Sequence, residues 1–222
     1  MSLAQIEQLL GAPLHAPKTA QIRQYATLLR KWNPKINLVA PSTLPNLEER
    51  HILDSAQLAP HLVSETPLEV LDVGSGAGLP GLILAILQPQ HRFTLAERDQ
   101  RKCAFLHTAA HSLGLTNVKV HAADVKTLTN QYDVITSRAW AELLDILTLT
   151  APLLKPYGSW LLLKGKALDT ELDTCETLFH LTTERTQSIV PTIDGEHGWV
   201  VKLTRNEVEL PHQFHGEPKP KI

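Results

Sequence analysis

The spacing of apolar positions changes part-way along the chain. Up to about residue 60, apolar residues recur every three or four positions. This pattern predicts a short helix that stops at 11–13, a second helix over 19–32 and a third over 48–55. From residue 68, short apolar runs alternate with longer amphipathic stretches, which is typical of parallel β-α-β units in a doubly wound sheet. The predicted strands are 68–73, 92–97, 118–122, 132–137 and 159–164, and the predicted helices begin at Pro80 or span 101–113, 143–153 and 168–179.

The end of the chain breaks this alternation. Apolar runs at 186–190 and 199–203 are separated by a turn-rich stretch without a helix, so they predict a final antiparallel pair at the edge of the sheet. The predicted fold class is α/β, with a mostly parallel, Rossmann-like sheet of seven strands, helices on both faces and an N-terminal helical segment. We expect this segment to span 1–62, the sheet domain 63–210 and a frayed C-terminal tail 211–222.

Composition and charge limit the compartment in which the protein is expected to work and the partners it is expected to bind. Of the 222 residues 43% are apolar, an ordinary globular balance, and no apolar run approaches the roughly 20 residues that cross a bilayer. The two cysteines, Cys103 and Cys175, lie outside any CxxC pair, which suits a reducing cytoplasm and argues against disulfides and zinc. His107 and His111 have metal-binding spacing but no third ligand, so we expect a cytoplasmic protein that needs neither metal nor membrane. The net charge of −2 means that a nucleic-acid partner would need a local basic face.

The clearest chemical signal is a glycine-rich loop between the first predicted strand and its helix. Residues 72–81 read DVGSGAGLPG, in which the glycines allow tight turns and close approach of the backbone to a ligand. The stretch also fits GxGxxG, so a dinucleotide is the alternative ligand. Asp72, at the strand end, would repel a pyrophosphate but suits the sulfonium and amino groups of S-adenosylmethionine. Glu97, at the end of the second strand, could accept hydrogen bonds from ribose hydroxyls of either ligand, and the DxGxGxG spacing favours S-adenosylmethionine.

The sequence restricts the identity of the methyl acceptor less than it restricts the identity of the cofactor. Residues 136–140 read TSRAW, not the Asp/Asn-Pro-Pro-Tyr type of stretch found in enzymes that methylate exocyclic amines. Neither cysteine lies near the C-terminus of a predicted strand, where a nucleophile for base C5 methylation would be needed. These absences favour an acceptor that is already nucleophilic, such as guanine N7, which needs only to be aligned. A small-molecule or protein methyltransferase and a non-catalytic nucleotide-binding module remain the alternatives.

Several stretches together resemble one methyltransferase family. They are KWN at 31–33 with NL at 37–38, RHILDS at 50–55, the loop at 72–81, SRA at 137–139 and KG at 164–165. On these motifs the chain resembles the RsmG family, also called glucose-inhibited division protein B, from about Trp32 to Lys202. The resemblance implies a class I methyltransferase fold, S-adenosylmethionine as the cofactor, and methylation of guanine N7 in the decoding-region loop of 16S ribosomal RNA. The implied partner is this RNA within the small ribosomal subunit or an assembly intermediate.

The loop chemistry, the family's motifs matched position by position, and the cations near the strand ends together supply the candidate site residues. The cofactor-binding candidates are Asp72, Gly74, Gly76, Gly78, Leu79, Glu97, Ala123, Asp124, Val125 and Arg138. The RNA-binding candidates are Arg50, Arg101, Lys102 and Lys164; Arg138 and Lys164 are also positioning candidates, and no residue is assigned to catalysis. We expect these five cations to form one basic face at the mouth of the cofactor cleft, because the C-termini of parallel strands converge there. For Arg50 and Asp54, four apart on a predicted helix, an ordinary ion pair is the alternative.

The chain departs from the family's pattern at three positions. Glu97 stands where the family usually has aspartate, and AADV at 122–125 stands where it tends to show Arg-x-Glu. His197 follows Gly195-Glu196 where the family usually has arginine, which weakens the case for an RNA contact at that position.

Overall fold

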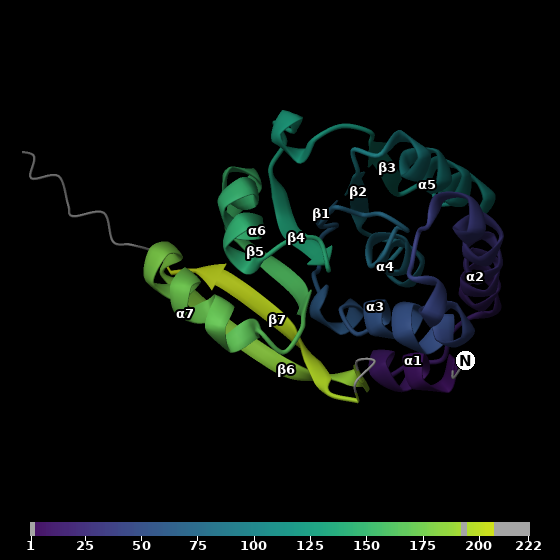
Figure 1. Cartoon of the computed structure of the whole chain (residues 1–222), viewed down its shortest axis with the longest axis horizontal. Coiled ribbons are helices and arrows are strands. Elements are labelled where there is room, and N and C mark those ends of the chain that lie inside the picture. Colours follow the sequence, from purple (N-terminus) through teal and green to yellow (C-terminus); the bar gives the residue numbers. More distant parts are fainter. Residues whose placement is uncertain (1–2, 192–194, 207–222) are drawn as a thin grey trace, which may run out of the picture.

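The computed structural model describes residues 3–191 and 195–206, and one twisted sheet lies at its centre (Figure 1). The seven strands lie in the order β3-β2-β1-β4-β5-β7-β6. Strands β1 to β5 are parallel, and β7 is antiparallel to both of its neighbours. Their bounds are β1 Glu69–Val73, β2 Arg92–Ala96, β3 Val118–His121, β4 Tyr132–Arg138, β5 Leu154–Lys164, β6 Leu181–Pro191 and β7 His197–Arg205. The predicted fold class, with its terminal antiparallel pair, is confirmed.

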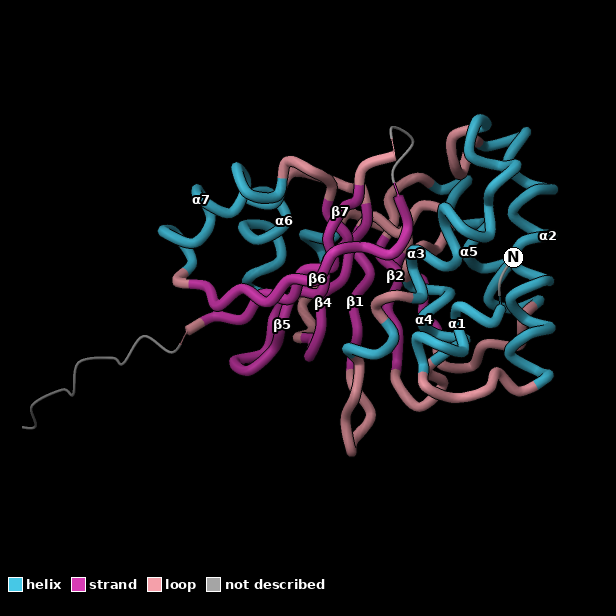
Figure 2. The backbone as a smooth tube through the Cα atoms, turned by 90° about the horizontal axis from the view of Figure 1, so that it is seen from below, coloured by secondary structure: helices cyan, strands magenta, loops and turns pink. Residues whose placement is uncertain are grey.

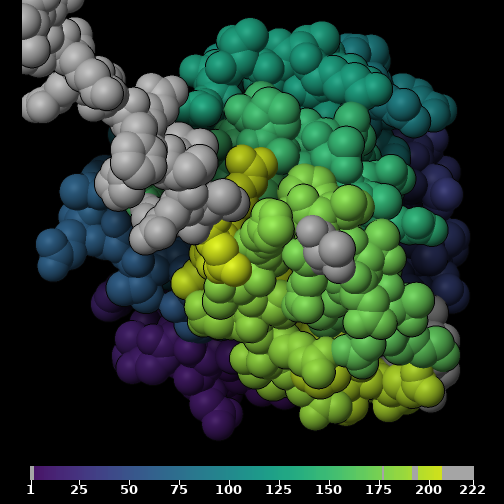
Figure 3. Space-filling model, turned by 90° about the vertical axis from the view of Figure 1, so that its left-hand side faces the viewer, coloured from purple at the N-terminus to yellow at the C-terminus, as the bar shows by residue number. Residues whose placement is uncertain are grey.

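Helices cover both faces of this sheet. Helices α1 to α5 lie on one side and α6 and α7 on the other (Figures 1 and 2), and Figure 3 shows the side that α6 and α7 cover, in green. The α-helices are α1 Leu3–Leu10, α2 Ala16–Ile36, α3 Asp54–Ala56, α4 Gly81–Leu87, α5 Gln100–Ser112, α6 Leu143–Thr150 and α7 Leu168–Phe179. Short 3-10 or π turns occupy Pro41–Asn46, Glu48–Leu53, Ala59–His61, Val125–Thr127 and Ala151–Leu153.

The core is divided by the sheet into two layers. In β5, Trp160 and Leu162 point into the layer that α6 and α7 close, whereas Leu161 and Leu163 point into the layer closed by the N-terminal helices, α4 and α5. Successive side chains of a strand face opposite sides, so a strand covered on both faces must be apolar throughout. This explains why the predicted strands appear in the sequence as continuous apolar runs.

The N-terminal helices share the core of the sheet domain. The Tyr25 hydroxyl donates to the carbonyl oxygen of Ala77 over 2.8 Å, and the Lys18 ammonium donates to the carbonyl oxygen of Leu87 over 2.6 Å. Trp32 on α2 meets Phe105 on α5 edge to face, with 5.8 Å between the ring centroids. These contacts attach α2 directly to the cofactor half of the sheet; the boundary at 62/63 stays a prediction.

The structure corrects the predicted end of the second helix. The sequence suggested a turn at Asn33-Pro34, but α2 continues to Ile36 with Pro34 in its last turn. The helix ends at Asn37, whose left-handed φ of 50° lets its N–H bond to the carbonyl of Asn33, while the Asn33 side chain accepts the N–H of Val39 over 2.8 Å. The proline therefore costs little, because the chain leaves the helix directly after it.

Two further predictions concern the C-terminal tail and membrane-spanning helices. The predicted tail at 211–222 lies outside the described residues. No helix in the described part of the chain combines the length and apolarity needed to cross a bilayer.

Candidate active site

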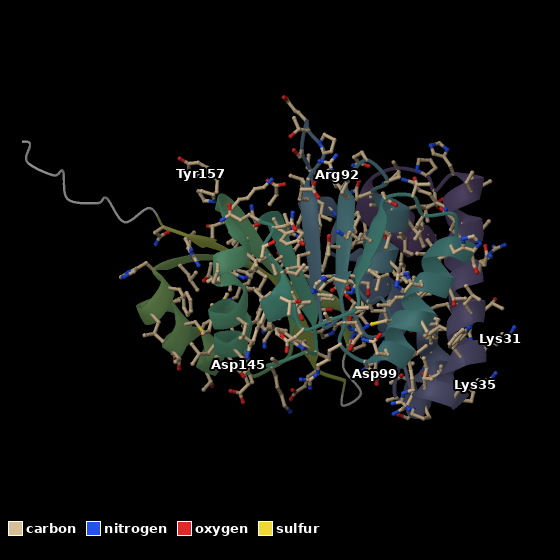
Figure 4. The ribbon with its side chains drawn as sticks, turned by 90° about the horizontal axis from the view of Figure 1, so that it is seen from above. Lys31, Lys35, Arg92, Asp99, Asp145 and Tyr157 are labelled. Carbon is tan, nitrogen blue, oxygen red and sulfur yellow. The ribbon has the colours of Figure 1, made fainter. Side chains whose placement is uncertain are left out.

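The C-terminal ends of the parallel strands meet along one edge of the sheet. Figure 4 shows this edge, where Asp99 follows β2 and Asp145 lies on α6, opposite the edge that carries Arg92 and Tyr157. In open α/β sheets, ligands bind at the edge formed by strand C-termini. The loop at 72–81 lies at the same edge because it follows β1.

Three glycines of this loop, Gly74, Gly76 and Gly78, have positive φ, and the first two of them shape the edge that faces the cavities. Gly74 and Gly76 have φ of +66° and +52°, a region that L side chains rarely adopt. This conformation lets the Gly76 N–H donate to Oε2 of Glu97 over 2.9 Å, while Oε1 of the same carboxylate accepts the N–H of Asp99 over 2.9 Å. Glu97 therefore ties the ends of β1 and β2 together.

Asp72 lies beneath the loop rather than at its surface. Its side chain is fully buried, and Oδ2 accepts the N–H of Gly81 over 3.1 Å. A Cβ at Gly81 would lie 2.6 Å from that oxygen, so only glycine permits the approach. Oδ1 has no hydrogen-bond partner among the described residues. Burial, reinforced by the charge of Glu97, raises the pKa of Asp72 to about 7.

A first cavity, of about 460 Å³, opens beside the loop. Five of the predicted cofactor contacts line it together with Arg98, Lys102 and Trp140; these five are Gly74, Glu97, Ala123, Asp124 and Val125. The carboxylate of Asp124 is engaged in local structure, because it accepts the N–H of Lys126 over 2.9 Å at the start of a 3-10 turn.

A second cavity, of about 240 Å³, lies on the other side of the loop. It is lined by Gly74, Gly76, Leu79 and Arg138 from the predicted set, and also by His51 and Lys102. Gly78 and Asp72 line neither cavity. An added Cβ at Gly78 would overlap Leu82 in the core, so this glycine serves packing.

A third cavity, of about 420 Å³, lies at the ends of β4 and β5 and shares Arg138 and Ala139 with the second. Its other walls come from Arg50, Asp54, Leu163, Lys164, Gly165, Lys166, Ala167, Glu171, Ser188, Val190, Pro191, Gly198 and Trp199. Because the first and second cavities share Gly74, Lys102 and Ala139, the three cavities lie next to one another along the strand ends.

Arg138, at the end of β4, joins the sheet to the N-terminal segment. Its Nε donates to Oδ2 of Asp54 over 2.9 Å, and Nη2 donates to the carbonyl of Arg50 over 3.0 Å and to Nδ1 of His51 over 2.7 Å. Nη1 makes no hydrogen bond to a described residue. The pKa of Asp54 is nevertheless raised, because burial outweighs the attraction of Arg138 and Arg50.

His51 is held in one neutral tautomer. The Thr43 hydroxyl donates to the carbonyl of Ala40, so its oxygen is left to accept the N–H at Nε2 of His51, 2.7 Å away. Nδ1 then carries the lone pair that receives the Arg138 hydrogen bond. Burial and the charges of Arg138 and Arg50 lower the pKa of His51 to about 3. The ring is therefore neutral at physiological pH and has no nitrogen left over for a substrate.

Comparison with known proteins agrees with this architecture. Residues 18–198 match the GidB family, described as rRNA small subunit methyltransferase G. The chain is similar to ribosomal RNA small subunit methyltransferase G of Cereibacter sphaeroides, with 43% identity covering 82% of this chain and 88% of that protein. The corresponding protein of Leptothrix cholodnii shows 37% identity over 85% of this chain and 88% of its own length.

The chain belongs to the GidB family. The resemblance seen in the sequence is thereby confirmed. Among solved structures, it is similar in fold to magnesium protoporphyrin IX methyltransferase from Synechocystis with bound S-adenosylmethionine. The TM-score is 0.62 at 11% identity, covering 82% of this chain and 97% of that one. The O-methyltransferase TomG from Streptomyces achromogenes gives a TM-score of 0.55 at 16% identity, covering 84% of this chain and 90% of that chain.

The basic face predicted for this GidB-family chain is largely engaged in internal contacts. The Lys164 side chain is only 9% exposed, and its ammonium lies 2.5 Å from Glu171 and donates to the carbonyl of Ala141. Arg50 donates to the carbonyl of Pro191 rather than pairing with Asp54 across one helical turn. Arg101 is exposed but bridged to Asp99 over 3.2 Å. Of the five predicted cations, Lys102 alone has no side-chain partner among the described residues.

Sequence reasoning missed three side chains that shape the site. Trp140 lies directly over Gly74, where its Cδ1 and Cγ occupy the space of a Cβ, and it walls the first cavity. His51 lines the second cavity and Trp199 lines the third. A signal existed only for His51, which stands in the motif RHILDS. Among the described residues, no three His, Cys, Asp or Glu side chains gather in a way that could hold a metal ion.

Replacing Gly74 by alanine should displace Trp140 and weaken binding of S-adenosylmethionine at least about tenfold, or 1.4 kcal/mol. The added Cβ would overlap the indole ring, and the φ of +66° adds backbone strain. Gly114→Ala is the matched control, because its φ is +65° but an added Cβ meets nothing within 4 Å. We expect Gly114→Ala to cost about 1–2 kcal/mol of stability and no affinity. Calorimetric titration and tryptophan emission measure both variants, and wild-type affinity in Gly74→Ala would contradict the steric role of Trp140.

Affinity for S-adenosylmethionine should rise with pH between about 5.5 and 7 and then level off. A cationic ligand favours ionised Asp72, so binding must release the proton that this carboxyl holds below its pKa of about 7. The expected loss is up to about tenfold per pH unit below 7. Titration in buffers of different ionisation enthalpy detects the released proton. Asp72→Asn should bind more weakly with a flatter pH profile; a flat profile in the wild type would exclude this coupling.

Replacing Asp54 by alanine should destabilise the fold by about 3 kcal/mol. The change leaves the buried guanidinium of Arg138 without its carboxylate partner. Glu48→Ala is the control, since Glu48 and Arg30 form a more exposed ion pair, with 43% of the arginine side chain accessible. That variant should lose less than about 1 kcal/mol. Urea unfolding of both variants tests the difference. Equal losses in the free energy of unfolding would show that the buried ion pair contributes no more to stability than the exposed one.

Proposed function

We propose that the chain transfers the methyl group of S-adenosylmethionine to N7 of a guanine in the decoding-region loop of 16S ribosomal RNA. Membership of the GidB family, whose relatives are named ribosomal RNA small subunit methyltransferases, supports the activity. Structural neighbours with bound S-adenosylmethionine support the cofactor. The observation that carries the proposal for this chain is that the cavities beside the glycine loop adjoin the third cavity, at the ends of β4 and β5, through shared lining residues.

The residues of the first two cavities fit S-adenosylmethionine. Each oxygen of Glu97 accepts one backbone N–H and keeps a lone pair, so the carboxylate can still accept from ribose hydroxyls. Ala123, Asp124 and Val125 line the end of the same cavity that would hold the adenine. The unpartnered Oδ1 of Asp72 places negative charge beneath the loop, which suits the cationic end of the ligand. When bound, the cofactor supplies a methyl group on a sulfonium.

The third cavity is the proposed site of the target nucleotide. It adjoins the glycine loop through Arg138 and Ala139, and one side is walled by Trp199. A base in a folded RNA must leave its stack to enter such a pocket. Arg138 lines both cavities, and its Nη1, which has no partner among the described residues, can donate to a guanine or phosphate oxygen.

N7 methylation needs no general base, and the two described carboxylates that line the third cavity, Asp54 and Glu171, are bridged to Arg138 and Lys164. His51 is neutral with both nitrogens hydrogen-bonded, so it has no free nitrogen to take a proton. Cys103 and Cys175 are buried, and burial raises the pKa of both thiols, which disfavours the nucleophilic thiolate. The N7 lone pair forms the new bond to carbon while the bond between that carbon and sulfur breaks, with its electron pair left on sulfur. The purine becomes cationic, and no proton moves.

The remaining assignments belong to the same proposal. The RNA is modified within the small ribosomal subunit or an assembly intermediate, and the protein acts in the cytoplasm. Alternatives with small-molecule or protein acceptors lack support of this kind, since the matching relatives are named for ribosomal RNA.

Small ribosomal subunits that lack the modification should accept labelled methyl from S-adenosylmethionine in the presence of this protein. Treatment of the product RNA with borohydride and then aniline should break the chain at one new guanine, because that chemistry reports N7-methylguanosine. The double variant Cys103→Ser/Cys175→Ser should keep turnover within a few-fold of wild type, since neither thiol takes part. Incorporation of label without a new break at a guanine would move the acceptor to another atom.

A further inference from the structure

Most of the cations predicted to face the RNA form hydrogen bonds or ion pairs within the protein. Other positively charged residues must therefore bind the RNA phosphates. Arg138 and Lys164 hold carboxylates and carbonyls, and Arg101 is bridged to Asp99. Four further cations near the cofactor edge have no side-chain hydrogen bond or ion pair with any described residue: Lys31, Lys35, Arg98 and Lys102. We call these four residues the α2–α5 basic surface.

Packing of α2 on α5 places Lys31 and Lys35 on a helix that lies against the helix carrying Lys102. Trp32, next to Lys31, contacts Phe105 on α5, one turn after Lys102. The chain after Lys35 leads directly to Leu38 and Val39, which line the second cavity together with Lys102. Figure 4 shows Lys31 and Lys35 at the edge of the molecule that carries Asp99, away from Arg92 and Tyr157. The α2–α5 basic surface therefore runs from the N-terminal segment to the mouth of the cofactor site.

None of these four cations forms an ion pair with a described residue, although Glu97, Asp124 and Asp145 line the first cavity together with Arg98 and Lys102. Lys31, Lys35 and Arg98 are exposed. The two lysines are four apart on α2, and like charges at this spacing disfavour the helix by a few tenths of a kcal/mol. The acidic side chains Glu48 and Asp99 are already bridged to Arg30 and Arg101.

The helix dipole accounts for only part of this arrangement. A cation in the last turn of a helix is favourable, which explains Lys35. Lys31 lies before that turn, and Arg98 and Lys102 lie at the N-terminal end of α5, where a cation is unfavourable. A group of cations without ion-pair partners, in a chain of net charge −2, indicates an anionic partner at this place.

We propose that the α2–α5 basic surface binds the phosphate backbone of the RNA substrate beside the nucleotide that enters the site. This inference rests on the proposed function. The ammonium groups of lysine act as point charges that suit phosphates, and such contacts orient an RNA without reading its sequence. The N-terminal helices therefore position the substrate, while Arg98 and Lys102 extend the same contact to the rim of the cofactor cavity.

The test removes the two lysines that lie outside both cofactor cavities. Lys31→Ala/Lys35→Ala should weaken binding to 16S ribosomal RNA and make the negative slope of log K against log salt shallower by between about 1.4 and 1.8, because each phosphate contact contributes about 0.7 to 0.9. KM for the ribosomal substrate should rise, while kcat at saturation and affinity for S-adenosylmethionine stay within about twofold of wild type. Both side chains are exposed, so the fold should be unaffected, as thermal unfolding would verify.

Arg23→Ala/Lys119→Ala is the matched control, because it removes the same net charge from exposed positions on α2 and β3. Neither residue lines the three cavities, so this variant should keep the wild-type slope to within about half a unit. Equal slopes in wild type and Lys31→Ala/Lys35→Ala, or an equal fall in both double variants, would overturn the inference. Failure of the wild type to methylate small subunits at all would instead overturn the proposed function.

Discussion

The site depends on one arginine that joins two parts of the chain. Arg138 ends β4, and its guanidinium is received by Asp54, by His51 and by the backbone of Arg50 in the N-terminal segment. A guanidinium presents several donors in a fixed plane, so it can hold three acceptors at once, which a lysine ammonium on a flexible stem does less well. Through this contact the N-terminal segment becomes a wall of the site.

Two carboxylates hold the glycine loop in place through its backbone N–H groups, and neither of them is hydrogen-bonded or ion-paired to Arg138. Asp72 accepts from Gly81 beneath it, and Glu97 accepts from Gly76 beside it. Both carboxylates are buried against backbone N–H groups, and their mutual repulsion contributes to the raised pKa of Asp72. Negative charge is thereby stored next to a space suited to a cationic ligand, whose arrival relieves part of the cost of burying it. The stored charge favours a sulfonium and disfavours a pyrophosphate.

The parts of this structure that could be predicted from sequence are those determined locally. The apolar runs and the glycine-rich loop at 72–81 can be recognised from residues that are neighbours in the sequence. The strands, the helices and the edge of the sheet that carries the cofactor site could therefore be predicted from these patterns. Contacts that depend on the tertiary fold could not be predicted in this way. Arg138 looked like a free cation, but His51, 87 residues earlier, is one of its acceptors. Trp140 stood in a stretch recognised only for lacking another motif, and its place over Gly74 depends on the turn after β4.

The same distinction explains the charge of the site. Residue type alone suggested that the arginines and lysine nearest the strand ends face the RNA, yet a cation near the core must be paired to be stable there. Arg138 and Lys164 meet that requirement with Asp54 and Glu171, which removes most of their field from the surface. Cations that remain able to attract a polyanion must lie farther out, where water solvates them without a partner. The helices packed beside the glycine loop offer such positions, so a protein of net charge −2 can still present a basic surface beside its cofactor site.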